Sequence, residues 1–206
     1  MIEQQVRPSD VLDTRVLAAL SVIMREQFVC EDLVSLAYAD TELPLGYGQT
    51  MLSPVLEGRL LQVLDVQPDE HVFEIGTGSG YFTALLAQLA KQVTSVEIIA
   101  DLSEQAKQKI GETENITLVI GDASQGWDLL DRVDVIIATA AFVTVPDRHK
   151  QALQIGGRML AVVGEAPAME VQIIQRIAER EWRTKTVFET VIPAMINAEP
   201  KPEFKF

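Results

Sequence analysis

The chain has 206 residues, of which 48% are apolar and 23% charged, and 30 acidic against 17 basic side chains give it a formal charge of −13. This length and apolar fraction predict one folded domain and exclude long disordered tracts. The negative charge disfavours binding of duplex nucleic acid or of anionic lipid, because phosphates would be repelled and no stretch of the chain concentrates basic residues.

One cysteine, Cys30, and two histidines, His71 and His149, limit the chemistry that the side chains can carry. A single cysteine excludes an internal disulfide, and these residues are fewer than the about four ligands of a His/Cys zinc site. No apolar stretch reaches the ~18 residues of a membrane span, and the N-terminus lacks a secretory signal pattern. We therefore expect a cytoplasmic protein with no metal, no membrane and no nucleic acid as partner.

Residues 1–53 are predicted to form a helical extension that ends in a loop. Apolar residues recur at helical spacing between Asp10 and Val29, which predicts one or two amphipathic helices. Residues 41–50 contain many turn formers and no regular period, so a loop is expected there. A helix should begin near Pro54, because proline is favoured in a first helical turn and leucines continue at helical spacing.

The rest of the chain alternates strands with helices. Strands are predicted at residues 72–75, 93–97, 116–120, 133–138 and 158–163, and helices at 81–90, 101–110 and about 147–154. This alternation requires crossover connections and therefore a mainly parallel sheet with helices on both faces. Two further strands, at 170–176 and 182–192, are expected to pair antiparallel. The predicted fold class is α/β, a Rossmann-like, doubly wound, mostly parallel seven-stranded sheet with an antiparallel edge and an N-terminal helical extension.

The segment from Glu74 to Tyr81, Glu-Ile-Gly-Thr-Gly-Ser-Gly-Tyr, joins the first strand of this sheet to its helix. An open parallel sheet binds ligands beyond the carboxyl ends of its strands, and glycines there allow the backbone to approach a ligand closely. A dinucleotide fold is the rival interpretation, but its G-x-G-x-x-G spacing would put the third glycine at residue 81. The carboxylate of Glu74 would repel a pyrophosphate and suits a cationic amino-acid group.

Two more acidic residues follow the next strands. Glu97 closes the second strand and can accept hydrogen bonds from both hydroxyls of a ribose, whereas Asp122, beside Ala123, can accept one from an adenine amine. Each alone has a simpler interpretation as a solvated or helix-capping carboxylate. Together with the glycine segment they favour S-adenosylmethionine, a sulfonium cation that also suits the negative charge of the chain.

Residues 54–196 are accordingly predicted to form the cofactor-binding core, with an extended tail at 197–206. The residues expected to bind the cofactor are Glu74, Gly76, Thr77, Gly78, Ser79, Tyr81, Glu97, Asp122 and Ala123.

Four parts of the chain carry a family resemblance: residues 15–17 with 25–29, residues 37–40 with 43–50, residues 74–81, and residues 156–164. They resemble class I S-adenosylmethionine-dependent methyltransferases, and within these the protein-L-isoaspartate O-methyltransferase family. The resemblance covers residues 1–164 and implies methylation of the free α-carboxylate of isoaspartyl residues in peptides or proteins. Such a carboxylate is ionised at neutral pH, so the reaction would need alignment and desolvation and no general base.

The acceptor loop departs from the family pattern. The family's loop continues Gly-Gln-Thr-Ile-Ser-Gln-Pro, and without a gap Leu52 falls on its serine and Ser53 on its glutamine. Either Ser53 supplies the hydroxyl from one residue over, or the acceptor is another carboxylate or a small molecule. A non-catalytic module that only binds the cofactor is a third interpretation. Thr50, Ser53 and Thr139, which follows the fourth strand, are expected to serve the acceptor.

Overall fold

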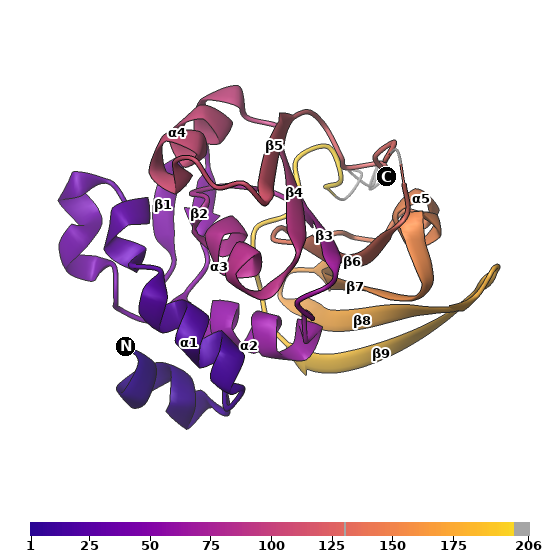
Figure 1. Ribbon diagram of the computed structural model, residues 1–206, viewed down its shortest axis with the longest axis horizontal. Coiled ribbons are helices and arrows are strands. Elements are labelled where there is room, and N and C mark those ends of the chain that lie inside the picture. The colour runs from indigo at the N-terminus through magenta and orange to yellow at the C-terminus, as the bar shows by residue number, and fades with distance from the viewer. Residues whose placement is uncertain (130, 200–206) are drawn as a thin grey trace, which may run out of the picture.

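The computed structural model describes residues 1–129 and 131–199, so the predicted tail lies outside the described residues from position 200 onward. A seven-stranded sheet in the order β5-β4-β3-β6-β7-β8-β9 crosses the molecule (Figure 1). Strands β3 to β7 run parallel, and β8 and β9 add an antiparallel edge, which confirms the predicted fold class. The strands are β3 (His71–Ile75), β4 (Gln92–Glu97), β5 (Ile116–Ile120), β6 (Val133–Ala138), β7 (Leu153–Glu165), β8 (Ala168–Ala178) and β9 (Glu181–Glu189).

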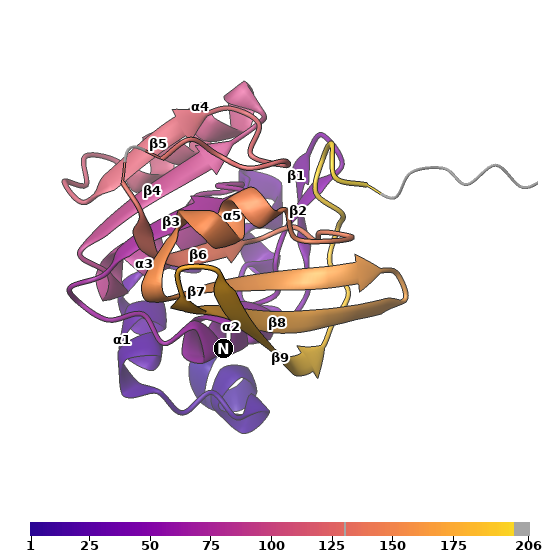
Figure 2. The same cartoon turned by 90° about the vertical axis from the view of Figure 1, so that its right-hand side faces the viewer.

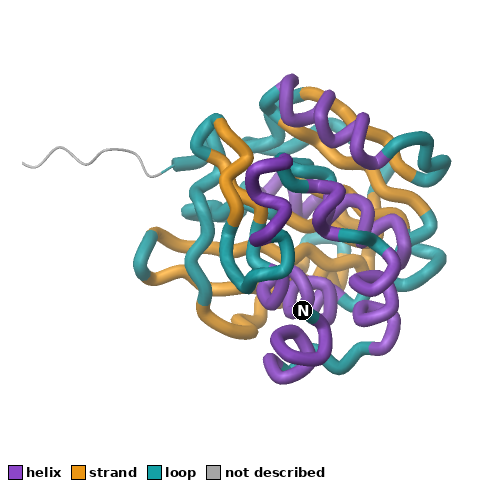
Figure 3. The backbone as a smooth tube through the Cα atoms, turned by 90° about the vertical axis from the view of Figure 1, so that its left-hand side faces the viewer, coloured by secondary structure: helices purple, strands orange, loops and turns teal. Residues whose placement is uncertain are grey.

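Helices cover both faces of the sheet. One face carries α1 (Thr14–Val22), α2 (Pro54–Leu64), α3 (Tyr81–Leu89) and α4 (Ala100–Ile110), and the view in Figure 3 looks onto these helices. The other face carries α5 (Asp147–Ala152), which lies in front of the sheet in Figure 2. Short helical turns surround α1: η1 (Ile2–Val6), η2 (Arg7–Ser9), η3 (Arg25–Phe28) and η4 (Glu31–Leu36).

Apolar side chains on the two faces of the central strands build two cores. On one face Val72 and Ile137 pack with residues of α1, α2 and α3, so the N-terminal extension shares a core with the sheet. On the other face Phe73 and Ile136 pack with Met159. Central parallel strands are buried on both sides, which explains their nearly continuous apolar sequences. In the part of the chain that the structure describes, no helix combines the length and apolar character needed to cross a membrane.

The prediction of a plain loop at residues 41–50 is wrong. The segment contains an antiparallel hairpin, β1 (Leu43–Gly46) and β2 (Gln49–Met51), in which Leu43 pairs with Met51. Three consecutive positive φ angles, 86° at Gly46, 54° at Tyr47 and 72° at Gly48, make its tight turn. The turn formers were therefore identified correctly, but strands of four and three residues are too short to show a period.

Several other boundaries also differ from the prediction: β7 begins at Leu153 and not at residue 158, and β8 spans Ala168–Ala178 where residues 170–176 were expected. The helix that begins at Asp147 ends at Ala152, because residues 153–154 already belong to β7. The last strand ends at Glu189, and residues beyond it turn back along the molecule: Ala141 and Ala194 form an isolated bridge. This return brings the C-terminal segment to the carboxyl ends of the parallel strands.

Candidate functional site

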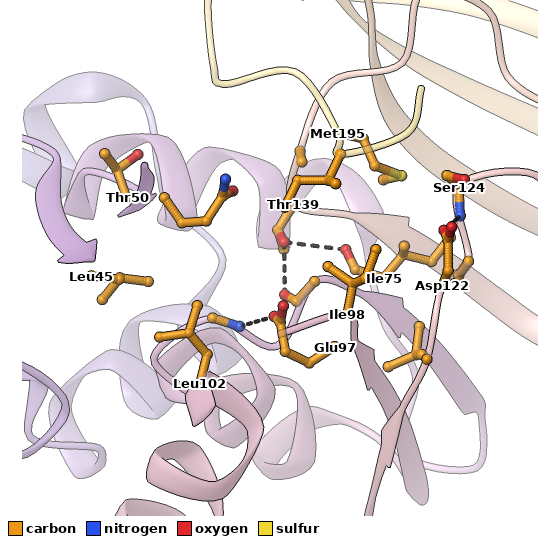
Figure 4. Close-up of a pocket in the computed structure, with 18 residues that line it drawn as sticks. Leu45, Thr50, Ile75, Glu97, Ile98, Leu102, Asp122, Ser124, Thr139 and Met195 are labelled. Atoms are coloured by element: carbon orange, nitrogen blue, oxygen red, sulfur yellow. Dashed lines mark hydrogen bonds between the residues drawn. The ribbon is translucent and has the colours of Figure 1, made fainter. Parts of the chain in front are cut away.

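A cleft lies beyond the carboxyl ends of β3, β4, β5 and β6, and we call it the main cleft (Figure 4). Its volume is about 600 Å³ with the open mouth included. Parallel strands bring their carboxyl ends to one edge of the sheet, which gathers residues that are far apart in the sequence. The predicted site residues that line the main cleft are Thr50, Gly76, Gly78, Glu97, Asp122, Ala123 and Thr139.

The glycine segment approaches β6 so closely that a side chain at its first glycine has no room. A Cβ atom on Gly76, where φ is 98°, would lie 2.4 Å from Oγ1 of Thr139. The Thr139 hydroxyl instead donates to the carbonyl oxygen of Gly76 at 2.7 Å. Thr139 therefore holds the backbone of the glycine segment in place at the floor of the cleft.

Glu97 holds the opposite side of the same segment. Its Oε2 accepts a hydrogen bond from the backbone N–H of Gly78 at 2.9 Å, and its Oε1 accepts one from Ile99 at 3.0 Å. The side chain lines the main cleft although its residue is only 5% exposed. One carboxylate thus joins the glycine segment to the residue that precedes α4, and each oxygen retains a lone pair for a ligand.

Asp122 is held on both oxygens as well. Oδ1 accepts from the backbone N–H of Ser124 at 2.8 Å, and Oδ2 accepts from Nδ2 of Asn197 at 2.8 Å. Burial raises the pKa of Asp122, but these hydrogen bonds outweigh burial and the net shift is downward. Asn197, together with Met195 and Ile196 in the cleft wall, comes from the C-terminal segment. No spacing or motif in the sequence connects this segment to Asp122, so sequence reasoning missed it.

The composition of the main cleft fits the predicted cofactor. Its described lining contains two carboxylates, Glu97 and Asp122, and neither lysine, arginine nor histidine. Carboxylates are acceptors, as ribose hydroxyls and an adenine amine require, and they attract a sulfonium cation. Ile98 and Leu102 supply apolar walls between them. A pyrophosphate would meet only negative charge here, which argues against a dinucleotide.

A second pocket of about 310 Å³ adjoins the main cleft. The two spaces have a common wall formed by Leu45, Thr50, Gly76, Gly78 and Thr139. The residues that line only the second pocket are Met51, Leu52, Glu57, Thr77, Ser79 and Phe82. Of the predicted cofactor residues, Thr77 and Ser79 thus face this pocket and not the main cleft.

The structure corrects the expectation for Ser53. Ser53 precedes the first residue of α2, where its carbonyl oxygen accepts from the N–H of Glu57 at 3.0 Å, and it lines neither the main cleft nor the second pocket. Leu52 does line the second pocket. Ser53 is thus not among the residues that line either space. Thr50 keeps its place between both spaces, with its hydroxyl donating to Oε2 of Glu42 at 2.9 Å.

Two residues of the glycine motif face away from both spaces, which corrects their predicted contact with the cofactor. Glu74 is wholly buried; the Thr83 hydroxyl donates to its Oε2, and Oε1 has no partner. Burial raises the pKa of Glu74 to about 8, although hydrogen bonds from Ser95 and Thr83 oppose the shift. Tyr81, the first residue of α3, packs its ring against Phe28 with centroids 5.5 Å apart. Both side chains lie on the side of the glycine segment that faces away from the two spaces.

A buried ion pair behind the second pocket was not predicted. The guanidinium of Arg25 donates through Nη1 to Oε2 of Glu57 and through Nη2 to the carbonyl oxygen of Leu52, the latter at 2.5 Å. It also lies over the ring of Tyr81, 5.0 Å from the centroid. Arg25 and Glu57 are 0% and 2% exposed. Nothing in the sequence links these two residues, because only the packing of η3 against α2 brings them together.

Comparison with known proteins places these features in a family. The sequence model of the family "Protein-L-isoaspartate(D-aspartate) O-methyltransferase (PCMT)" matches residues 1–197. A protein-L-isoaspartate O-methyltransferase from Photorhabdus laumondii is 44% identical over 163 residues, which are 78% of either chain. One from Methanoculleus marisnigri is 38% identical over 189 residues, 91% of this chain and 84% of its own.

Solved structures show the same architecture. A putative enzyme of this name from Plasmodium falciparum, in complex with S-adenosyl-L-homocysteine, has a TM-score of 0.82 at 18% identity and covers 92% of this chain and 94% of its own. A structure described as protein-L-isoaspartate O-methyltransferase also has a TM-score of 0.82, at 25% identity, with 94% of this chain and 64% of that chain covered. The first of these likenesses bears on the fold alone.

Proposed function

The chain belongs to the protein-L-isoaspartate O-methyltransferase family. We propose which of its two adjoining spaces binds the methyl donor and which binds the acceptor of this S-adenosylmethionine-dependent methyltransferase. The enzyme methylates the free α-carboxylate of L-isoaspartyl residues in peptides and proteins. The observation that carries the assignment of the spaces is their common wall, since a donor in the main cleft and an acceptor in the second pocket would meet over Gly76 and Gly78.

The main cleft would hold the cofactor. Glu97 would accept hydrogen bonds from the ribose, Asp122 would accept one from the adenine amine, and backbone of the glycine segment would lie against the amino-acid part. When bound, S-adenosylmethionine supplies an activated methyl group on a sulfonium sulfur and leaves as S-adenosylhomocysteine. Ile98 and Leu102 would exclude water from the two sides of the nucleoside.

The second pocket would hold the acceptor carboxylate. That group is ionised at neutral pH, so the protein has to orient and desolvate it and need not remove a proton. Thr50 lies on the wall common to both spaces and is our candidate for orienting it. Thr50 would give up its hydrogen bond to Glu42 in this role, whereas we assign Thr139, which donates to Gly76, the role of fixing the glycine segment.

The direct test uses two peptides that differ only in the linkage at one aspartate. With labelled S-adenosylmethionine, the isoaspartyl peptide should acquire a base-labile methyl ester and the normal aspartyl peptide should not. Calorimetry with S-adenosylhomocysteine checks that the enzyme preparation binds the cofactor product. Binding of the product without methylation of either peptide would contradict the proposed acceptor.

Leu52 favours a second candidate, a methyltransferase of the same fold that acts on another carboxylate or a small molecule. Its side chain replaces a hydroxyl in the wall of the second pocket, beside Met51 and Phe82. An anionic acceptor that lost a hydrogen bond there would bind more weakly by about 1–3 kcal/mol.

The variant Leu52→Ser discriminates these candidates. It should raise kcat/KM for the isoaspartyl peptide by about tenfold if Leu52 has adapted the pocket to another acceptor, since about 1.4 kcal/mol corresponds to a factor of ten. The matched control is Leu56→Ser, on α2 and outside both spaces. An unchanged or lower kcat/KM in Leu52→Ser would favour the isoaspartyl peptide as the acceptor of the pocket as it stands.

A further inference from the structure

An acidic side chain, Glu57, lines the second pocket, although the proposed function requires this pocket to admit an anion. We infer that Glu57 determines acceptor specificity: a carboxylate acceptor binds only when Glu57 carries a proton, so the Arg25–Glu57 pair makes acceptor binding proton-coupled. The inference rests on the proposed function and adds a specificity-determining residue to it.

Apart from the sulfonium of the donor, the described residues offer the acceptor one counter-charge, Arg25. Glu57 projects from α2 and lines the second pocket, whereas Arg25 contacts Glu57 from behind and lines neither space. Among the described residues that line the second pocket, none is basic. These contacts identify Arg25 as the positive charge nearest to the pocket wall. When Glu57 is ionised, it neutralises this charge.

Several hydroxyl groups around the pocket are already engaged. The Thr77 hydroxyl shares a hydrogen bond of 2.6 Å with Ser95, and Oγ of Ser79 accepts from the N–H of Tyr81 at 3.2 Å. The Thr139 hydroxyl donates to Gly76. With Leu52 in place of a hydroxyl, a protonated Glu57 adds a hydrogen-bond donor for an incoming carboxylate, beside the Ser79 hydroxyl, which accepts from Tyr81 and keeps its own hydrogen to donate.

Two ionised carboxylates in such a pocket would repel each other. Like charges a few ångströms apart in a buried site cannot both stay ionised without a strong free-energy cost. With a proton on Glu57, the charge of Arg25 is no longer compensated and attracts the acceptor. With Glu57 ionised, the ion pair is neutral and the protein offers no positive charge to offset the burial of the acceptor carboxylate.

The surroundings of Glu57 favour its protonated form. Burial raises the pKa of Glu57 to about 8, and the attraction and hydrogen bond of Arg25 only partly oppose this. Glu74 on β3 adds a further upward shift through its charge. Tyr81 on α3 also faces the pair, and burial followed by the charge of Glu57 raises the pKa of its phenol, so it stays neutral.

The test measures KM and kcat from pH 6.5 to 9.5 with an isoaspartyl peptide that has blocked termini and no other titratable group. In the unchanged enzyme, KM should rise by about tenfold per pH unit above pH 8 while kcat changes less than about threefold. In Glu57→Gln, KM should stay within about threefold of its low value across the range. Glu74→Gln is the comparison variant, because it removes a carboxyl group of similar burial that lines neither space; it should keep the rise, displaced to lower pH because the charge of Glu74 no longer raises the pKa of Glu57.

A second measurement does not depend on any variant folding. Calorimetry of peptide binding to the enzyme saturated with S-adenosylhomocysteine, in two buffers of different ionisation enthalpy, should show uptake of about one proton at pH 9. A flat KM in the unchanged enzyme, an unaltered rise in Glu57→Gln, or no proton uptake would overturn the inference. Absence of isoaspartyl methylation at every pH would overturn the proposed function as well, so the two failures are distinguishable.

Discussion

Gly78 is a residue of the glycine segment where a side chain would disturb both the backbone and the wall of the cleft. Its φ of 54° lies in the left-handed region, and a Cβ there would lie 3.2 Å from Cδ1 of Leu45. Its N–H is also the donor to Glu97. A β-branched side chain at this position would strain the backbone and narrow the wall common to the two spaces.

Gly78→Val should therefore abolish binding of S-adenosylhomocysteine. The control is Gly111→Val, because Gly111 has a similar φ of 69° with open space around its Cβ position and follows α4 away from both spaces. Both variants should lose stability, but only the first should lose binding in a calorimetric titration. Equal affinity in Gly78→Val and the unchanged enzyme would refute the assignment of the main cleft.

The buried carboxyl group of Glu74 leads to a separate prediction, which concerns the stability of the folded protein. Its pKa of about 8 in the folded protein exceeds the ordinary value of 4.5, chiefly through burial. Between these values the folded protein holds a proton that the unfolded chain has lost, so the free energy of unfolding falls as pH rises from about 4.5 to about 8.

Glu74→Gln removes this titration and should flatten the decline. Urea unfolding at pH 5.5 and 8.5 should show that the variant gains at least about 1 kcal/mol relative to the unchanged protein between the two pH values. Because each protein is compared with itself at the two pH values, any pH-independent cost of the new amide to the free energy of unfolding cancels. A decline of the same size in both proteins would show that Glu74 is ionised in the folded state.

At the scale of elements, two segments cover the main cleft from opposite sides. The β1–β2 hairpin contributes Leu45 and Thr50, and its tip is fastened where the hydroxyl of Tyr47 donates to Asp101 at the start of α4. The C-terminal segment is fastened by Asn197 on Asp122.

Tyr47→Phe should loosen the hairpin. A net hydrogen bond is worth about 0.5–1.5 kcal/mol, and an exposed one lies at the lower end, so the dissociation rate of S-adenosylhomocysteine should rise about two- to fivefold. Stopped-flow displacement measures this rate. Tyr38→Phe, at another exposed tyrosine outside both spaces, serves as the control; if both variants release the ligand at the unchanged rate, the hairpin does not gate the cleft.

The same elements show what could be read from the sequence. Apolar runs separated by amphipathic stretches predicted the sheet, and parallel strands then had to bring Glu97 and Asp122 to one edge. The motif also predicted Glu74 and Tyr81, yet the chain reverses through the glycines, so these two side chains point into the core. The Arg25–Glu57 pair escaped notice because its members are 32 positions apart and no period or motif connects them.

At the scale of the whole molecule, the net charge of −13 and the absence of basic residues from the described lining of the main cleft act together. Both favour a cationic ligand over an anionic one. S-adenosylmethionine meets this requirement, and a nicotinamide dinucleotide with its pyrophosphate does not.

Ligand-induced stabilisation tests this preference on the complete chain. S-adenosylmethionine at 100 times its Kd should raise the free energy of unfolding by about 2.7 kcal/mol, measured as a rise in Tm. The dinucleotide NAD at the same concentration should leave Tm unchanged. Stabilisation by NAD alone would contradict the assignment of the main cleft.

The common wall of the two spaces has a consequence for inhibition. A nucleoside analogue joined by a short linker to a carboxylate mimic would span Gly76 and Gly78 and occupy the main cleft and the second pocket at once. Joining two weak ligands makes the second binding event intramolecular, with an effective concentration in the millimolar range for short flexible linkers. Such a bisubstrate compound should bind more tightly in acid and more weakly in alkali, because an ionised Glu57 would repel its anionic half.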